Sequence, residues 1–401
     1  MPEISAQPTT AEPPRHARHV GRPFLGLIDA VLVPDPTSFD FDGAISNAHA
    51  LAAWTWMQRD LAPDLIAPNA SDDDPSARQA LDAAMPELLT RARAAMAEAH
   101  SKPEALRRIK VQFGGDDPWA RLPQVLNALK HRSLLERAQS FGRATNSMAD
   151  EAALALALQS MPLPDQPLCA MLMQAAMGQV SNPTKLMSAV IRITGAATEG
   201  AVHRAGFAPL VDAMLSHAQA QIPALDQFGA FADIDLTCRA IDRFHRLMRA
   251  VSGYIELGRL SRWSMTIAGI TKTVSEMVEP KLRDVGPDVN RALRRRGDGL
   301  NDRLDTDQLL AALNGCYVLA TVRDCRDSLA LNALFEQTWA QVGQALELNM
   351  QRNLDIFRQD PTDKVTAARL DAAIKMAELR FNTEYADVLR RAREGAEKRA
   401  G

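Results

Sequence analysis

The chain has 401 residues, of which 46% are hydrophobic and 24% charged, with a formal net charge of −3. This length exceeds what one hydrophobic core usually organises, so we expect two domains or one elongated helical array. The near-neutral charge gives no electrostatic reason to expect nucleic acid as a partner, because nucleic-acid binding rests largely on basic surfaces that neutralise phosphates.

Aromatic residues are sparse at 5%, and Ala, Leu and Met supply most of the apolar content. These residues favour helices over strands. We therefore predict an all-α fold, with an N-terminal array of short helices followed by a bundle of long antiparallel helices. The abundance of Ala and Arg suggests a GC-rich coding sequence and hence a bacterial source.

The cysteines and the apolar segments bear on the compartment. Four cysteines are scattered without a Cys-x-x-Cys pair, which excludes a readable disulfide framework or zinc knuckle. They are Cys169, Cys238, Cys316 and Cys325. The N-terminus has no apolar core typical of a secretory signal, and no apolar run is long enough for a membrane span. We expect a cytoplasmic protein with reduced thiols.

Proline content divides the chain. Residues 1–22 mix Pro, Thr and charge without periodicity, which predicts a disordered tail. Only three of the 23 prolines follow Pro223, and proline interrupts helices. We therefore predict a short-helix domain over 23–222, of which a divergent solenoid is one version, and a long-helix bundle over 223–401.

Within 23–222, residues 22–43 favour a helix over a short buried strand. A clear helix start lies at "SNPTKLMSAV", with Asn182 as N-cap and Pro183 in the first turn. Trp54 and Trp56 lie two residues apart, so one helix cannot turn both towards the same core. Either a second layer covers one of them, or it anchors a partner, and internal packing is the preferred alternative.

Within 223–401, apolar residues recur at steps of three and four, which is typical of amphipathic helices. One stripe runs from Leu331 to Phe357, and a second from Leu370 to Ala392 through Tyr385 and Val388. We predict helices near 223–252, 254–279, 306–359 and 363–398. Asp305 and Gln308 have capping-box spacing at the start of the third, and Gly315 is its candidate break.

The segment "CRAIDRFHRLMRA" offers candidate chemistry. On a helix, Cys238, Asp242 and His245 fall within a sector of roughly 60°, so they are candidates for a nucleophile, an orienting carboxylate and a base. The competing interpretation is that the thiol and the imidazole mark the boundary between core and solvent, with Asp242 paired to nearby arginines. No metal-binding spacing accompanies them, and we expect neither a metal nor another cofactor.

A cluster of arginines precedes Gly297: Arg291, Arg294, Arg295 and Arg296. Cations at a helix C-terminus complement its dipole, and the glycine can cap the helix. The alternative is a site for an anion or an acidic partner.

Apolar stripes are plentiful while convergent polar groups are scarce. We therefore expect a protein-protein interaction or scaffold protein that binds a protein partner or self-associates, and is oligomeric. The alternatives are an all-α enzyme that uses the Cys238 helix face and an anion-binding module at the arginine cluster.

Overall fold

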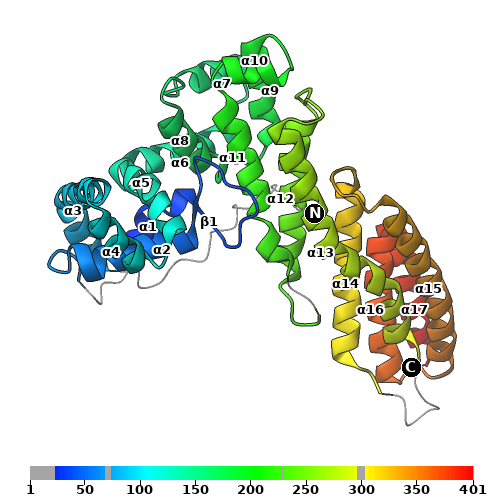
Figure 1. The fold of residues 1–401 in the computed structure, drawn as a ribbon. Helices are drawn as coiled ribbons and strands as arrows, with labels where there is room; N and C mark the ends of the chain where they lie inside the picture. Colours follow the sequence, from blue (N-terminus) through cyan, green and yellow to red (C-terminus); the bar gives the residue numbers. More distant parts are fainter. Residues whose placement is uncertain (1–22, 68–73, 227–228, 296–302, 401) are drawn as a thin grey trace, which may run out of the picture. The chain divides into compact units, whose positions relative to one another are not determined.

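The computed structural model confirms the all-α class (Figure 1). It describes four stretches of the chain, which are residues 23–67, 74–226, 229–295 and 303–400. The chain is 78% helical, with 17 α-helices in the described stretches. The predicted tail at residues 1–22 lies outside the described residues.

The chain divides into two compact units. The first comprises Met1–Ala220 with Arg246–Thr266, and the second comprises Gln221–His245 with Ile267–Gly401. Residues 246–266, which the sequence analysis assigned to the long-helix bundle, thus belong to the first unit. The predicted domains themselves stay a prediction, because compactness alone does not show that a part folds independently.

The first unit consists mainly of helices of modest length. They are α1 (Pro23–Leu27), α2 (Asn47–Trp56), α3 (Pro75–Ser101), α4 (Pro103–Phe113), α5 (Asp116–Lys130), α6 (Arg132–Ser147), α7 (Glu151–Gln159), α8 (Gln166–Met177), α9 (Pro183–Thr194), α10 (Glu199–Arg204) and α11 (Ala208–Gln219). The predicted start at Asn182 and Pro183 is confirmed as the beginning of α9.

Helix α8 lies at the centre of this unit, where it packs against α6 and α11. Every residue from Cys169 to Met177 is buried, so this helix has no solvent-facing side over that length. Close approach is possible because α6 presents Gly142, where an added Cβ would lie 2.1 Å from the carbonyl oxygen of Ala176. Only a glycine permits two backbones to meet at this distance.

Residues 22–43 are less helical than expected. After α1, a 3-10 turn (Asp29–Val31) leads into strand β1 (Leu32–Val33), which pairs in parallel with β2 (Ile45–Ser46). The expectation of a helix holds only for the five residues of α1. Val31 to Val33 are buried, and this β-branched, apolar segment fits the buried-strand alternative.

The second unit contains longer helices. Two helices contribute to both units, α12 (Ile234–Ser252) and α13 (Arg262–Leu293). The other helical elements of the second unit are a 3-10 turn (Ile222–Leu225), α14 (Thr306–Cys325), a second 3-10 turn (Arg326–Ser328), α15 (Asn332–Gln359), α16 (Lys364–Arg380) and α17 (Thr383–Ala400). Helix α16 packs against α14, α15 and α17.

Two predicted helices are each divided in the structure. The 306–359 helix breaks at residues 326–331 rather than at Gly315, which lies inside α14 and faces Val285 at a distance that leaves little room for a side chain. The 363–398 helix breaks at Phe381 and Asn382, where the Asn382 side chain accepts a hydrogen bond from the Tyr385 amide, 2.7 Å long. Asparagine is a strong N-cap, so α17 begins there.

Helix α15 confirms its predicted stripe, since Phe335, Val342, Leu346 and Phe357 are all buried. Helix α17 does not follow its own prediction. Tyr385 and Val388 are exposed, and the buried residues of this helix are Ala386 and Ala396. The new helix start at Asn382 changes the face of α17 that turns inward.

Candidate functional site

Cys238 and His245, the proposed nucleophile and base on α12, contact different side chains of the second unit. Cys238 and His245 are seven residues apart on α12, which separates them by about 10 Å along the axis. The Cys238 thiol instead hydrogen-bonds Thr321, and Nδ1 of His245 lies 2.9 Å from Oγ of Ser328. The thiol and the imidazole thus have separate partners. Asp242 lies between them in sequence, on the same helix.

Electrostatics at Cys238 also oppose nucleophilic chemistry. Burial raises the pKa of this thiol, although the hydrogen bond from Thr321 and the nearby Lys281 ammonium act in the other direction. Burial lowers the pKa of Lys281 to about 8, and its ammonium donates a hydrogen bond to the carbonyl of Leu225. A reactive cysteine needs a lowered pKa, so this environment favours an unreactive thiol.

The arginine cluster lies at the C-terminal end of α13. Arg291, Arg294 and Arg295 line a pocket of about 630 Å³ together with Pro287 and Asn290. Arg296 lies outside the described residues. Arg291 pairs with Asp288 at 3.1 Å, in the manner of an ordinary surface ion pair. Anion or partner binding at this cluster stays a prediction.

Trp54 and Trp56 are both buried, with exposed fractions of 6% and 2%. Trp54 packs against Phe24, and Trp56 against Phe113, with ring centroids 5.0 Å apart in each pair. A second layer of helices therefore covers the far side of α2, as the internal-packing alternative requires. Both rings are thus packed internally, and a role for them in partner binding stays a prediction without support from their exposure.

Three helices of the first unit line a groove that the sequence analysis did not predict. Its volume is about 630 Å³, and it is open to solvent rather than enclosed. One stripe from each of α3, α5 and α8 forms its walls, and Asp42 closes one side. This volume falls in the range of ligand-binding clefts, about 300–1,000 Å³.

Apolar residues form much of the groove surface. Met171 and Leu126 are buried, and Met96 is half-buried. Methionine is flexible and polarizable, so it adapts to differently shaped occupants and is common at binding surfaces. The two methionines come from α3 and α8 and thus from different walls of the groove.

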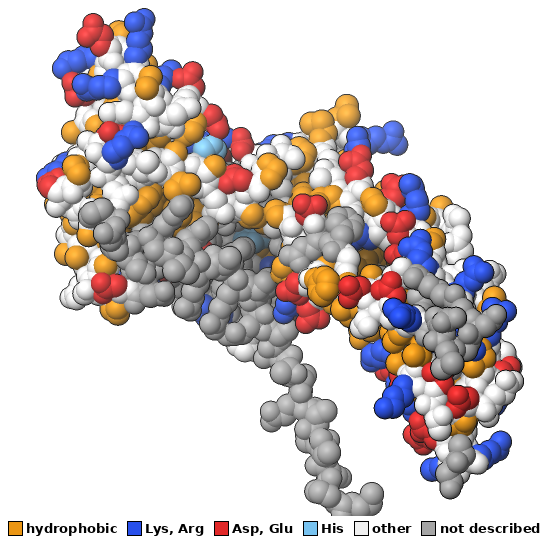
Figure 2. All heavy atoms as spheres, turned by 90° about the horizontal axis from the view of Figure 1, so that it is seen from below, with side chains coloured by type: hydrophobic (Ala, Val, Ile, Leu, Met, Phe, Trp, Pro, Cys, Tyr) orange, Lys and Arg blue, Asp and Glu red, His pale blue; other side chains and the backbone are white. Residues whose placement is uncertain are grey.

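The polar rim of the groove is basic. Arg93 on α3 and Lys130 on α5 are exposed, and neither forms an ion pair with a residue in the described ranges. Basic and acidic side chains are interspersed over the face shown in Figure 2.

Neighbouring arginines of the same unit behave differently. Arg91, two residues before Arg93, pairs with Asp64 at 2.7 Å and with Glu87 at 2.9 Å. Arg132, two residues after Lys130, pairs with Asp82 at 2.6 Å. On α3, Arg91 is thus paired outside the groove, whereas Arg93 at the groove is not.

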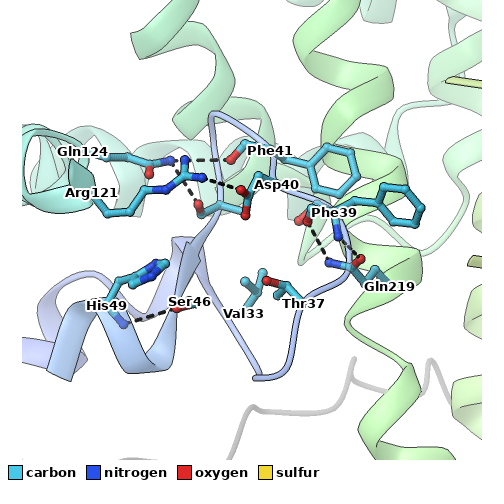
Figure 3. A pocket seen from close by; sticks show the side chains of 12 residues that line it. Val33, Thr37, Phe39, Asp40, Phe41, Ser46, His49, Arg121, Gln124 and Gln219 are labelled. Atoms are coloured by element: carbon cyan, nitrogen blue, oxygen red, sulfur yellow. Dashed lines mark hydrogen bonds and ion pairs between the residues drawn. The ribbon is translucent and has the colours of Figure 1, made fainter. Parts of the chain in front are cut away.

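The wall at Asp42 belongs to the loop of residues 34–44, which joins β1 to β2 (Figure 3). Gln124 on α5 donates to the carbonyl of Asp42 and, at 3.0 Å, to that of Ala44. Arg121 forms an ion pair with Asp40. Since Gln124 and Arg121 also line the groove, α5 fixes this loop and the groove wall together.

Helix α11 holds the other end of the same loop. Oε1 of Gln219 accepts hydrogen bonds from the amides of Ser38 and Phe39, and its Nε2 donates to the Phe39 carbonyl at 3.0 Å (Figure 3). The cavity beneath the loop measures only about 10 Å³, on the order of one water molecule. A ligand would therefore bind in the open groove and not under the loop.

A half-buried carboxylate supports the loop from a third side. Asp212 accepts a hydrogen bond from Nε1 of Trp263 at 2.8 Å and lies 3.4 Å from Arg262, which also donates to the carbonyl of Asp40. Burial raises the pKa of Asp212, against the opposing effects of the Trp263 hydrogen bond and of Arg262. The loop is thus bonded to residues from α5, α11 and α13.

Sequence reasoning missed the groove because its residues are far apart along the chain, from Asp42 to Met171. One local signal existed. On α5, Ala120, Asn127 and Lys130 follow each other at helical spacing on one face, next to apolar residues. Lack of pairing at Lys130 and Arg93 is visible only in three dimensions.

The described residues contain no group of three or more His, Cys, Asp or Glu side chains placed to hold a metal ion. Within the same stretches, no helix combines the length and the apolar character needed to cross a membrane.

No protein-family model, curated protein or solved structure matches this chain.

Proposed function

We propose that this chain is a cytoplasmic protein-interaction or scaffold protein, and that the groove between α3, α5 and α8 is its binding face. The observation that supports this proposal is the combination of an apolar, methionine-containing surface with two unpaired cations on its rim. Interfaces typically combine an apolar centre with a polar rim. The free cysteines fit a reducing compartment.

An enzyme that uses the Cys238 helix face has less support. A nucleophile and its base need hydrogen-bond contact, and Cys238 and His245 have different partners two turns apart. The groove offers no alternative nucleophile, since Asp42 is the only acidic residue among those that line it, and no Cys or His accompanies it. Binding is therefore the function that this surface supports best.

The test is affinity capture from an extract of the source cells, read by quantitative mass spectrometry. The bait proteins are the wild type, the groove variant Arg93→Glu/Lys130→Glu, and a control variant Arg107→Glu/Arg137→Glu. Arg107 and Arg137 are exposed on α4 and α6 of the same unit and do not line the groove. Both double variants change the net charge by the same amount.

We expect a defined set of proteins to be retained by the wild type and the control variant and lost from the groove variant. Surface substitutions of this kind usually change stability by less than about 0.5 kcal/mol, so circular dichroism should give three similar melting curves. Equal retention by all three baits would exclude the groove as the interaction face. Absence of any specifically retained protein would contradict the proposed function itself.

A further inference from the structure

We propose that the occupant of the groove is an acidic, amphipathic helix of a partner protein. This inference rests on the proposed function and adds to it the chemistry and conformation of the bound segment. Three features support this inference separately: the unpaired cations on the rim, the open shape of the groove, and walls made of helices whose main-chain groups are already hydrogen-bonded.

Charge complementarity gives the sign of the occupant. Arg93 and Lys130 stand on different helices and have no ionic partner in the described stretches, while Arg121 already pairs with Asp40. Asp42 is the only acid at the groove, on the side held by the 34–44 loop. Carboxylates placed along the rim at Arg93 and Lys130 would supply the missing partners.

The lining indicates that the occupant also has apolar side chains. Met96, the half-buried one of the three apolar side chains named for the lining, would remain in contact with water beneath a purely polar ligand. A leucine- or methionine-sized side chain placed against it would remove that apolar surface from water, which is the main favourable term in association. The occupant is therefore amphipathic, with carboxylates beside its apolar side chains.

Shape favours a polypeptide over a small molecule. Small-molecule sites bury most of the ligand surface, and this groove is open to solvent. The lining stripe of α5 extends from Ala120 to Lys130, which is about 15 Å of helix axis. A bound helix of about ten residues has the same length.

The backbone around the groove favours a helix over an extended strand. The walls are helices whose main-chain groups already form internal hydrogen bonds, so they offer no sheet edge for strand addition. A helical segment satisfies its own backbone and needs only side-chain anchors at steps of three and four. Asn127, half-buried in the middle of the stripe, adds a side-chain amide that can both donate and accept hydrogen bonds.

The experiment measures fluorescence anisotropy of labelled peptides of about twelve residues, a length slightly greater than that of the groove. The first peptide has Leu at helical steps of three and four and Glu beside them. In the second, Lys replaces Glu, and in the third, Ser replaces Leu. Each is titrated with the wild type, with Arg93→Glu/Lys130→Glu, and with the control Arg107→Glu/Arg137→Glu.

We expect only the Glu/Leu peptide to bind the wild type and the control, with an affinity that weakens as salt is raised. The groove variant should bind it roughly tenfold less tightly or worse, since two attractive contacts become repulsive. Hydrogen exchange should show protection of α3, α5 and α8 by the peptide. Equal binding of this peptide to the groove variant, or its failure to bind the wild type, would overturn the inference.

Other occupants give different results. Displacement of the peptide by dodecanoate at similar affinity would assign the groove to a small amphiphile. Concentration-dependent dimerisation that is lost in the groove variant would assign it to a second copy of this chain. Either result would overturn the acidic-helix inference. If the peptide fails while the capture experiment still depends on Arg93 and Lys130, the proposed function stands and only the occupant is wrong.

Discussion

Replacement of Gly43 by Ala tests how tightly the groove wall is held. An added Cβ would lie 2.2 Å from the carbonyl oxygen of Ala170 on α8, whereas ordinary contacts begin at 3.4 Å. The 34–44 loop would have to move by more than 1 Å. The hydrogen bond from Gln124 to Ala44, now 3.0 Å long, would then exceed the normal range.

The expected loss combines two contributions. Overpacking of a tight contact costs about 1–3 kcal/mol, and each lost hydrogen bond costs about 1 kcal/mol. A destabilisation of about 2–5 kcal/mol corresponds to a fall in melting temperature of about 5–15 °C for a unit of this size. Differential scanning calorimetry of the full chain measures it directly.

Gly395→Ala provides the matched control. Gly395 lies inside α17 with nothing within 4 Å of an added Cβ, so the same substitution should be neutral or stabilise by up to about 1 kcal/mol. If Gly43→Ala melted within about 1 °C of the wild type, the close approach of the loop to α8 would not exist in solution. The account of the groove wall would then be wrong.

Three further predictions follow from individual side chains. The raised pKa of Asp212 means that its contribution to stability is present below the unfolded pKa, about 3.8, and is lost as pH rises through the folded value. The free energy of unfolding of the wild type relative to Asp212→Asn, which keeps an acceptor for Trp263, should therefore fall as pH rises across the acidic range; a constant difference would contradict the raised pKa. Arg380→Lys should lower the free energy of unfolding of the second unit by about 1–2 kcal/mol, measured by chemical denaturation. Arg380 stacks on the Trp339 ring at 4.2 Å and donates a hydrogen bond to the Trp339 carbonyl, and lysine cannot reproduce both contacts. An unchanged denaturation midpoint would contradict the stacking. Cys238 should react with iodoacetamide near pH 8 more slowly than a free cysteine, since burial raises its pKa; faster alkylation would revive the catalytic interpretation.

The fold class was accessible from the sequence because its causes are local. Low aromatic content and apolar residues at steps of three and four predict helices, and the stripe of α15 is buried as its spacing requires. The break before α17 was also visible in principle, since "FNTE" places a capping residue, Asn382, in front of Thr383 and Glu384. Reading that cap would have corrected the inward face of α17.

The candidate site was not accessible in the same way. Helical projection grouped Cys238 with His245 by angle but ignored their separation along the axis, and it could not supply Thr321 and Ser328 as their partners. The groove depends on tertiary packing, since its walls come from three helices. A sequence gives the charge of Lys130 but not the absence of a partner for it.

A charge-exchange titration tests the central claim most directly. Anisotropy is recorded for the Glu/Leu and Lys/Leu peptides against the wild type and Arg93→Glu/Lys130→Glu. The account predicts that the Glu/Leu peptide prefers the wild type and that the Lys/Leu peptide prefers the variant, each by roughly tenfold. If both peptides bound both proteins equally, the unpaired cations would have no part in recognition, and the groove would not be the binding face proposed for this protein.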